Sequence, residues 1–248
     1  MGTRILLISD IHGNWPALQA VVADLPVSTF DTIINCGDSL VYGPFPKETL
    51  DWLRSFATFS VLGNTDIKVR KLLQGKSIKK PSKPEKRIMY ESTAEMLEQA
   101  NIKYLFSLKK SDALVLPVSL DRKNPETKIG IFHGSPEHHN EFLFPTTPQA
   151  RFREIANHSN FDIILTGHSH TPYHLHFGAT HFINPGSVGR MFDGDPRASC
   201  ATLTIKDNIL KVDHFRIKYD IANTTRQLKK LQLPSIYADM FRKGRKLN

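Results

Sequence analysis

The chain has 248 residues, of which 40% are hydrophobic and 23% charged, a balance typical of globular proteins and not of disordered or fibrous ones. No apolar run approaches the roughly 20 residues that span a bilayer. The opening MGTRILLISD is too short in apolar residues for the core of a signal peptide. We therefore expect a cytoplasmic protein without a membrane segment. The two cysteines, Cys36 and Cys200, do not require an oxidising compartment, although a disulfide between them is an alternative interpretation.

The net charge is +9 and the pI is about 9.5, so the surface attracts phosphate-bearing partners in general. The positive charge is concentrated in two runs, Lys68–Arg87 and Phe241–Lys246. For both runs a solvated surface is the simpler interpretation. Nucleic acid stays a weakly supported partner, because basic runs without a recognised binding motif are weak signals.

The first part of the chain alternates between strand and helix patterns. Thr3–Ser9 contains the apolar run Ile-Leu-Leu-Ile of a buried strand. Asn14 is a predicted N-cap, with Pro16 in the first turn of the helix that follows. The next predicted elements are a strand at Thr32–Cys36, a helix at Lys47–Phe56 and a strand at Thr58–Leu62. This order predicts a mostly parallel sheet covered by helices.

The rest of the chain is predicted in three parts. Residues 66–110 form a helical insertion, with an exposed loop at Gly75–Pro84. Strands follow at Ala113–Leu120, Lys128–His133, Phe161–Thr166, Tyr173–Phe177, Thr180–Ile183, Ser199–Ile205 and Leu210–Ile217, with a helix at Pro148–His158. The late strands lie close together in sequence, which favours an antiparallel second sheet. Residues 221–248 form a helical tail that docks by Leu228, Leu231, Tyr237 and Met240.

Polar side chains stand directly after several of the predicted strands. They are Asp10, His12, Asp38, Asn64, His133, His168 and His170. In open α/β sheets, ligands bind outside the carboxyl ends of the strands, so we expect these seven side chains to meet. Seven oxygen and nitrogen donors are enough for two metal ions that share one carboxylate. Glycine neighbours most of these strand ends, at Gly37, Gly63, Gly134 and Gly167, and we expect it to let the backbone turn sharply there.

The donor types narrow the choice of metal. Imidazole, carboxylate and amide groups without a thiolate suit Mn, Fe, Ni or Zn at a catalytic site. Each short motif alone is weak, and only their joint occurrence in order at strand ends is specific. We assign the remaining histidines of the late strands to structural roles: His174, His176, His181 and His214.

The series SDIHGN, GDS, GNTD, FHGSP and GHSH resembles the calcineurin-like metallophosphoesterase superfamily from Ile5 to about Ile205. The phrases VYGPFP, NPGSVG and DGDPRAS resemble its bacterial and archaeal phosphodiesterase-like branch, which includes YfcE-type enzymes. We expect one domain over residues 1–248. The resemblance implies a four-layer α/β/β/α sandwich, with two mixed sheets flanked by helices. It also implies a dinuclear metal centre. One ion would be held by Asp10, His12, Asp38 and His170, and the other by Asp38, Asn64, His133 and His168.

The function that follows is hydrolysis of a phosphate ester, most simply a phosphodiester, by a hydroxide bound to the two metals. Catalytic roles are predicted for Asp38, Asn64, Thr65 and Asp66, and Mn is the first choice of metal. Many relatives carry a histidine where this chain has Thr65, and threonine is no general acid near neutral pH. Protonation of the leaving group is therefore unassigned, with His138 and His139 as candidates.

Several alternatives stay open. The substrate is a small phosphate ester, with nucleotides as one candidate class. A phosphomonoesterase or protein phosphatase of the same fold is the nearest alternative. A basic nucleic-acid-binding protein with a residual metal site is the second. A pure scaffold is disfavoured, because clustered buried charges without partners are costly. Oligomeric state cannot be read from the sequence.

Overall fold

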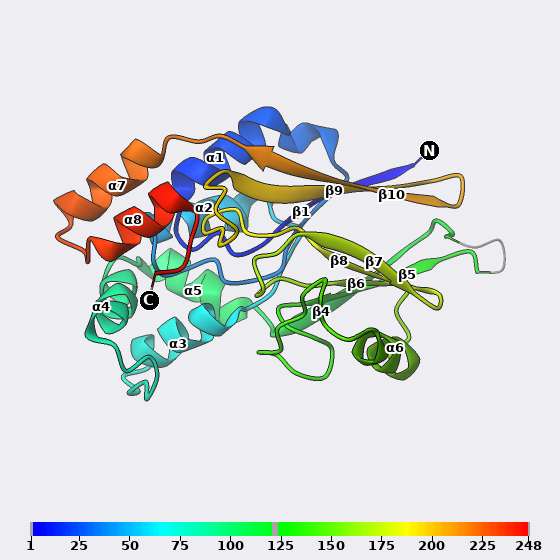
Figure 1. Cartoon of the computed structure of the whole chain (residues 1–248), viewed down its shortest axis with the longest axis horizontal. Helices are drawn as coiled ribbons and strands as arrows, with labels where there is room; N and C mark the ends of the chain where they lie inside the picture. The colour runs from blue at the N-terminus through cyan, green and yellow to red at the C-terminus, as the bar shows by residue number, and fades with distance from the viewer. Residues whose placement is uncertain (1, 121–123, 248) are drawn as a thin grey trace.

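The computed structural model describes residues 2–120 and 124–247, which contain two five-stranded sheets (Figure 1). The first sheet has the strand order β10-β9-β1-β2-β3. Its strands are β1 (Thr3–Ile8), β2 (Thr32–Asn35), β3 (Phe59–Ser60), β9 (Ala198–Lys206) and β10 (Ile209–Ile217). β1, β2 and β3 run parallel, as predicted, while β9 runs antiparallel to both β1 and β10.

The second sheet has the strand order β4-β5-β6-β8-β7. Its strands are β4 (Ser111–Leu116), β5 (Thr127–Phe132), β6 (Ile163–Leu165), β7 (Tyr173–Phe177) and β8 (Thr180–Asn184). β5, β6 and β8 are parallel, and the edge strands β4 and β7 are antiparallel to their neighbours. Both sheets are therefore mixed.

The prediction that the late strands build an antiparallel second sheet is wrong. β9 and β10 form the expected hairpin, but they join the first sheet, where Thr3 pairs with Ile205. The second sheet has three parallel strands at its centre, because helix α6 (Gln149–His158) provides the crossover from β5 to β6. Closeness in sequence predicted the hairpins correctly but not the sheet that each hairpin joins.

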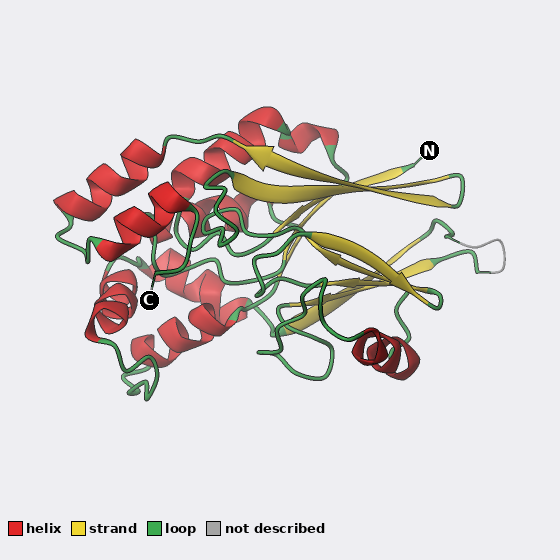
Figure 2. Ribbon diagram, in the orientation of Figure 1, coloured by secondary structure: helices red, strands yellow, loops and turns green. Residues whose placement is uncertain are grey.

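Helices cover the outer faces of both sheets, which confirms the four-layer α/β/β/α arrangement (Figure 2). α6 packs on the second sheet through Phe152 and Ile155. The remaining α-helices are α1 (Trp15–Asp24), α2 (Pro46–Phe56), α3 (Asn64–Leu73), α4 (Pro84–Glu95), α5 (Gln99–Ser107), α7 (Ile221–Lys230) and α8 (Ile236–Lys243). Figure 2 shows most of them gathered towards one end of the molecule, while the strands extend towards the other.

The core between the sheets explains why β1 is apolar on both faces. Side chains alternate along a strand, so Ile5 and Leu7 pack against the second sheet while Leu6 and Ile8 face the helices. All four are fully buried, and each contributes on the order of 1.5–3 kcal/mol of hydrophobic stabilisation. This packing fixes the point where β1 ends and the first polar residues of the site begin.

Two details differ from the sequence-based expectations. Asn14 does stand at the N-cap of α1, but its side chain makes no capping bond. Its amide instead donates to the Gly189 carbonyl at 2.9 Å and accepts from Thr224 at 2.8 Å, so it ties α1 to α7 and to a site loop. Leu231, expected to dock the tail, is 36% exposed.

The segment predicted as a helical insertion, residues 66–110, contains α4, α5 and all of α3 except its first two residues, and the tail contains α7 and α8. Met1 and Asn248, which end the predicted domain, lie outside the described residues. Among the described residues, no helix is both long and apolar enough to cross a membrane.

Candidate metal centre

The seven predicted ligands lie at the carboxyl ends of strands or of the segments that continue them. Asp10 and His12 follow β1, and Asp38 follows β2. Asn64 begins α3 directly after the β3 segment. His133 follows β5, while His168 and His170 follow β6. The sheets thus bring together residues that are up to 160 positions apart in the chain.

Five of these residues have a left-handed backbone conformation. Their φ angles are 52° at Asp10, 52° at His12, 50° at Asp38, 65° at His168 and 55° at His170. Such conformations cost on the order of 1 kcal/mol or more for residues with a Cβ, and they concentrate at functional sites. The expectation that neighbouring glycines make the turns is therefore wrong except at Gly37, whose φ is +95°. The ligand residues make the turns themselves.

Two of the neighbouring glycines serve a different purpose, which is close approach. A Cβ at Gly63 would lie 2.0 Å from Oδ1 of Asp38, and a Cβ at Gly167 would lie 2.1 Å from Oγ of Ser9. Neither distance is sterically possible without displacing the neighbour. These positions need glycine because the ligand loops pack directly against their backbone.

The ligand atoms form two groups. In the first, Nε2 of His170 lies 3.1 Å from Oδ1 of Asp10 and 3.3 Å from Nε2 of His12. Asp38, His133 and His168 make up the second, and within each group all ligand atoms lie within 4.8 Å of one another.

Asp38 stands between the two groups, and Asn64 lies beside the second. One oxygen of Asp38 is 3.5 Å from Nε2 of His133, and its other oxygen is 3.9 Å from Nε2 of His12. Oδ1 of Asn64 lies 3.4 Å from Nε2 of His133. The carboxylate of Asp38 is therefore placed to contact an ion in either group.

Backbone carbonyls fix the orientation of three imidazoles. Nδ1 of His12 lies 3.2 Å from the carbonyl oxygen of Leu40, and Nδ1 of His133 lies 2.9 Å from that of Cys36. Nδ1 of His170 lies 2.5 Å from the carbonyl oxygen of Arg190. A carbonyl only accepts hydrogen bonds, so Nδ1 carries the hydrogen in each ring. The lone pair of Nε2 is then directed towards the centre of the site, as in metal-binding histidines.

The electrostatics of the site favour cation binding. Burial, together with His170, lowers the pKa of His12 well below its usual range, and burial with His133 lowers the pKa of His168 to about 3. Against the opposing effect of burial, His170 holds the pKa of Asp10 below its usual range. Oδ1 of Asp10 is buried and has no hydrogen-bond partner among the described residues. The neutral imidazoles of His12 and His168 and the ionised Asp10 with its unpartnered oxygen fit divalent cations. Asp38 raises the pKa of His133 against the effect of burial, and burial raises the pKa of Asp38.

Asp66 and Thr65, both predicted as catalytic, lie at the back of the site. The Asp66 carboxylate is fully buried and accepts hydrogen bonds from the N–H groups of Gly63, Ser39 and Leu40. Burial and the nearby Asp38 raise the pKa of Asp66 to about 7. The Thr65 N–H donates to Asp38 at 2.7 Å, and its hydroxyl donates to the Leu40 carbonyl at 3.1 Å. Both residues hold the Asp38 loop against α3.

The candidates for a replacement acid lie outside the site cavity. The His139 ring packs 5.7 Å from the His133 ring, and burial with the His133 charge lowers the pKa of His139 to about 4. His138 is exposed. Neither residue lines the cavity beside the ligands.

The loop Asn184–Ser187, predicted as a supporting turn, connects the ligand loops. The Asn184 amide donates to the Gly167 carbonyl at 2.7 Å, and the Ser187 hydroxyl donates to the Asp10 carbonyl at 2.7 Å. The side chains of this turn, and not only its backbone, therefore hold the β1 and β6 loops together.

Sequence reasoning missed several residues of the site. A cavity of about 130 Å³ opens over the ligands and Thr65, and its other walls are Tyr42, Lys86, Phe142, Arg190, Phe192 and Lys246. Lys86 and Lys246 belong to the two basic runs that we interpreted as solvated surface. Arg190 directly follows the phrase NPGSVG, but nothing in that phrase indicates that its side chain is buried.

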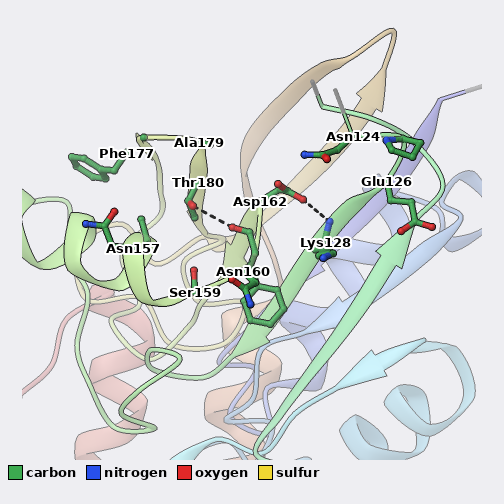
Figure 3. Close-up of a pocket in the computed structure, with 14 residues that line it drawn as sticks. Asn124, Glu126, Lys128, Asn157, Ser159, Asn160, Asp162, Phe177, Ala179 and Thr180 are labelled. Carbon is green, nitrogen blue, oxygen red and sulfur yellow. Dashed lines mark hydrogen bonds between the residues drawn. The ribbon is translucent and has the colours of Figure 1, made fainter. Parts of the chain in front are cut away.

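A larger cavity lies elsewhere and carries different chemistry (Figure 3). Its volume is about 570 Å³, and it lies where β5, β6 and β8 begin, at the end opposite to the ligands. There the Asp162 carboxylate accepts from the Lys128 N–H at 2.7 Å, and the Thr180 hydroxyl donates to the Phe161 carbonyl at 3.2 Å. Within the described ranges, the groups able to hold a metal lie only at the carboxyl ends.

Comparisons with known proteins agree with the geometry. The chain is 30% identical over 260 residues to an uncharacterised protein of Methanocaldococcus jannaschii, covering 98% of this chain and 99% of the relative. It resembles the structure of a metallophosphoesterase from Sphaerobacter thermophilus with a TM-score of 0.78 and 28% identity, over 98% and 99% of the two chains.

A hypothetical protein from Pyrococcus horikoshii shares the fold, with a TM-score of 0.81 and 18% identity over 99% of this chain and 100% of the other. The calcineurin-like phosphoesterase superfamily domain matches residues 3–208. With the donor groups described above, these matches show that the chain belongs to the calcineurin-like phosphoesterase superfamily.

Proposed function

We propose that this protein is a metal-dependent phosphodiesterase with a dinuclear centre. Asp10, His12, Asp38 and His170 would hold one ion, and Asp38, Asn64, His133 and His168 the other. The observation that carries the proposal is the pair of donor groups that share the edge of the sandwich with Asp38 between them. Mn²⁺ is our first choice of ion, with Fe, Ni or Zn as alternatives, because the donors are imidazole, carboxylate and amide.

Two divalent cations bound here would activate water for in-line attack on phosphorus and neutralise charge on the phosphoryl oxygens. Residues of the chain orient the substrate and the carboxylate of Asp38. Asn64 lines the cavity, where its amide can position an ester oxygen by hydrogen bonding. Thr65 and Asp66 act as positioning residues, because their hydrogen bonds hold the carboxylate of Asp38 and the loop that carries it.

Two features of the cavity bear on the substrate: the leaving group that it favours and the room that it leaves for the second substituent of a diester. Thr65 does not take the place of the histidine acid that many relatives carry, since its hydroxyl donates to the Leu40 carbonyl. Leaving groups that need no proton should therefore react fastest. The cavity is open beside Phe142, which is 53% exposed, so a second ester substituent can extend into solvent.

A substrate panel tests the proposal. The protein is freed of metal, reloaded with Mn²⁺ and assayed with bis(p-nitrophenyl) phosphate and with p-nitrophenyl phosphate. We expect Mn-dependent hydrolysis that favours the diester, and a loss of more than about 100-fold in Asp38→Asn. Faster hydrolysis of the monoester would favour a phosphomonoesterase or protein phosphatase. No hydrolysis, together with salt-sensitive binding to DNA or RNA, would favour a nucleic-acid-binding protein.

Thr65→His tests the role of the missing acid. We expect it to accelerate esters with poor leaving groups by about 10-fold or more, while p-nitrophenyl esters change little. Thr65→Ser keeps a hydroxyl and serves as the control. Equal rate changes for alkyl and aryl esters in Thr65→His would contradict this account.

The cellular setting remains an expectation. Cys36 and Cys200 are both buried and free, which agrees with a reducing compartment such as the cytoplasm. A nucleotide is the substrate class that we favour.

A further inference from the structure

Arg190 is a buried cation without an acidic partner in the part of the chain that the structure describes. Its side chain is 7% exposed, and none of the ion pairs found among the described residues includes it. Nη2 contacts Sδ of Met240 at 3.2 Å, and Nε has no hydrogen-bond partner within the described ranges. A buried charge without a counter-ion is costly, so this arrangement needs an explanation.

Aromatic rings hold the guanidinium in place. Its central carbon lies 3.9 Å from the centre of the Tyr42 ring, 5.0 Å from that of Phe192 and 5.8 Å from that of Tyr237. Cation–π contacts offset part of the desolvation cost, on the order of 0.5–2 kcal/mol. They leave Nε of the guanidinium without a hydrogen-bond partner among the described residues. The rings therefore orient Arg190 but do not replace an anion.

Two lysines reach the same cavity from distant parts of the chain. Lys86 comes from α4 and Lys246 from the segment after α8, and both line the cavity together with Arg190. Neither lysine belongs to an ion pair in the part of the chain that the structure describes. Burial and the positive charges of Lys246 and Arg190 lower the pKa of Lys86. Three like charges that converge in this way repel one another until an anion binds.

The scissile phosphate alone does not account for so much positive charge. Under the proposed function, the carboxylates of Asp10 and Asp38 are committed to the two cations, whose combined charge already exceeds that of the carboxylates. A phosphodiester carries a single negative charge. Three further cations at the mouth of the site match a substrate that carries additional negative charge beside the reacting ester.

We propose that Arg190, Lys86 and Lys246 form a subsite for a second phosphate group of the substrate. This inference rests on the proposed function and specifies its substrate class as a nucleotide that bears an additional phosphate. The aromatic residues beside the cations favour a nucleotide. Phe142 stacks on His168 with ring centres 3.9 Å apart, and it lies nearly parallel to Phe144 at 5.9 Å. Both rings are partly exposed and offer a face for a base.

Equilibrium binding tests the subsite without relying on turnover. Adenosine 3′,5′-bisphosphate and adenosine 5′-monophosphate share a base and differ by one phosphate. Isothermal titration calorimetry with the metal-free and Mn-loaded protein should show tighter binding of the bisphosphate, by about 10-fold or more. In the double variant Lys86→Gln/Lys246→Gln the preference should fall below about twofold.

A matched control removes the same charge outside the cavity. Lys83 and Lys243 each lie three positions from a subsite lysine and do not line the cavity. The double variant Lys83→Gln/Lys243→Gln should keep the wild-type preference for the bisphosphate. If both double variants lose the preference equally, the effect is general charge attraction and the subsite is overturned.

Arg190→Met separates binding from structure, because methionine keeps an unbranched apolar side chain but removes the charge. We expect the preference for the bisphosphate to fall at least about 10-fold. We also expect a melting temperature equal to or above that of the wild type, because an unpaired buried charge is removed. A lower melting temperature with an unchanged preference would assign Arg190 a purely structural role and overturn the proposal for it.

The two proposals fail in different ways. Equal affinities for the bisphosphate and the monophosphate, in a protein that hydrolyses bis(p-nitrophenyl) phosphate, would overturn the subsite alone. A clear preference for the bisphosphate, in a Mn-loaded protein that hydrolyses no ester, would support the subsite and count against the proposed hydrolysis.

Discussion

The molecule contains two clusters of four histidines that differ in almost every physical respect. The ligand cluster consists of His12, His133, His168 and His170. The edge cluster consists of His174, His176, His181 and His214, on β7, β8 and β10. Both clusters bring imidazoles into contact, but only the first also brings carboxylates into reach. Of the two clusters, only the first belongs to the groups of described residues that could hold a metal ion.

The edge cluster is held together by its own rings. Nε2 of His174 lies 3.0 Å from Nδ1 of His181, and the rings of His176 and His181 stack with centres 4.1 Å apart. Nε2 of His214 donates to the Asn184 carbonyl at 2.9 Å. These residues have ordinary strand conformations: His174 and His176 lie on the edge strand β7 of the second sheet, His181 on its neighbour β8, and His214 on the edge strand β10 of the first sheet. One nitrogen each of His174, His181 and His214 is engaged by another ring or by the backbone, and the cluster is not among the described groups that could hold a metal ion.

The largest expected effect separates the two clusters directly. His170→Ala removes a ligand whose orientation the backbone fixes, so we expect metal content to fall by about one ion per chain and diester hydrolysis to fall more than about 100-fold. His176→Ala in the edge cluster should change neither by more than about twofold. Metal content is measured by plasma mass spectrometry after reconstitution with Mn²⁺. A similar loss in both variants would remove the distinction.

A pair of glycine variants sharpens the comparison through the backbone. In Gly63→Ala the new methyl group would collide with Oδ1 of Asp38 at 2.0 Å, so we expect a metal affinity at least about 10-fold weaker. Gly178, in the turn between β7 and β8, has a φ of +62° and nothing within 4 Å of an added Cβ. Gly178→Ala should cost about 1 kcal/mol of stability and leave metal affinity unchanged. Titration with Mn²⁺ and denaturant unfolding measure the two quantities.

Asn184 connects the two clusters. Its side-chain amide donates to the Gly167 carbonyl, and its backbone carbonyl accepts from His214. Asn184→Ala leaves the buried Gly167 carbonyl without its donor, which costs about 1–3 kcal/mol of stability. We also expect a metal affinity about 10-fold weaker, since the loop carries His168 and His170. Unchanged metal affinity with lowered stability would show that the loop holds its shape without this amide.

The smallest effect is a pH dependence of stability from the edge cluster. Burial with His176 and His174 lowers the pKa of His181 from 6.5 to about 4. The unfolded chain therefore takes up the proton first, and stability is lost as pH falls from about 6.5 towards 4. Because solvent screens a half-exposed ring, we expect less than about 1 kcal/mol. Denaturant unfolding of His181→Gln should show a shallower loss over this range, and an unchanged slope would contradict the assignment.

Much of this arrangement could be predicted because the site obeys a local rule. A buried apolar strand followed at once by a polar residue, as in Ile8 and Asp10, marks both the end of a strand and a possible ligand. The rule works because parallel strands end at one edge. It could not predict which sheet β9 joins. A hairpin forms between strands that are neighbours in the sequence, whereas the sheet that the hairpin joins depends on packing against strands far away in the sequence.

The subsite cations were unpredictable for the same reason. Lys86 and Lys246 lie in basic runs that resemble any solvated surface, and only the packing of α4 and α8 brings them to Arg190. The role of Asp66 was also hidden, because its motif indicates an acid near the site but not that three backbone N–H groups occupy its carboxylate.

The most direct measurement is the number of ions bound per chain. Purified protein, stripped with chelator and titrated with Mn²⁺ under equilibrium dialysis, should bind two ions per chain, and Asp38→Asn should bind fewer than two. His181→Gln should still bind two. A wild-type protein that binds no Mn²⁺, Fe²⁺, Ni²⁺ or Zn²⁺ at saturating concentration would contradict the central claim that these seven side chains form a dinuclear centre.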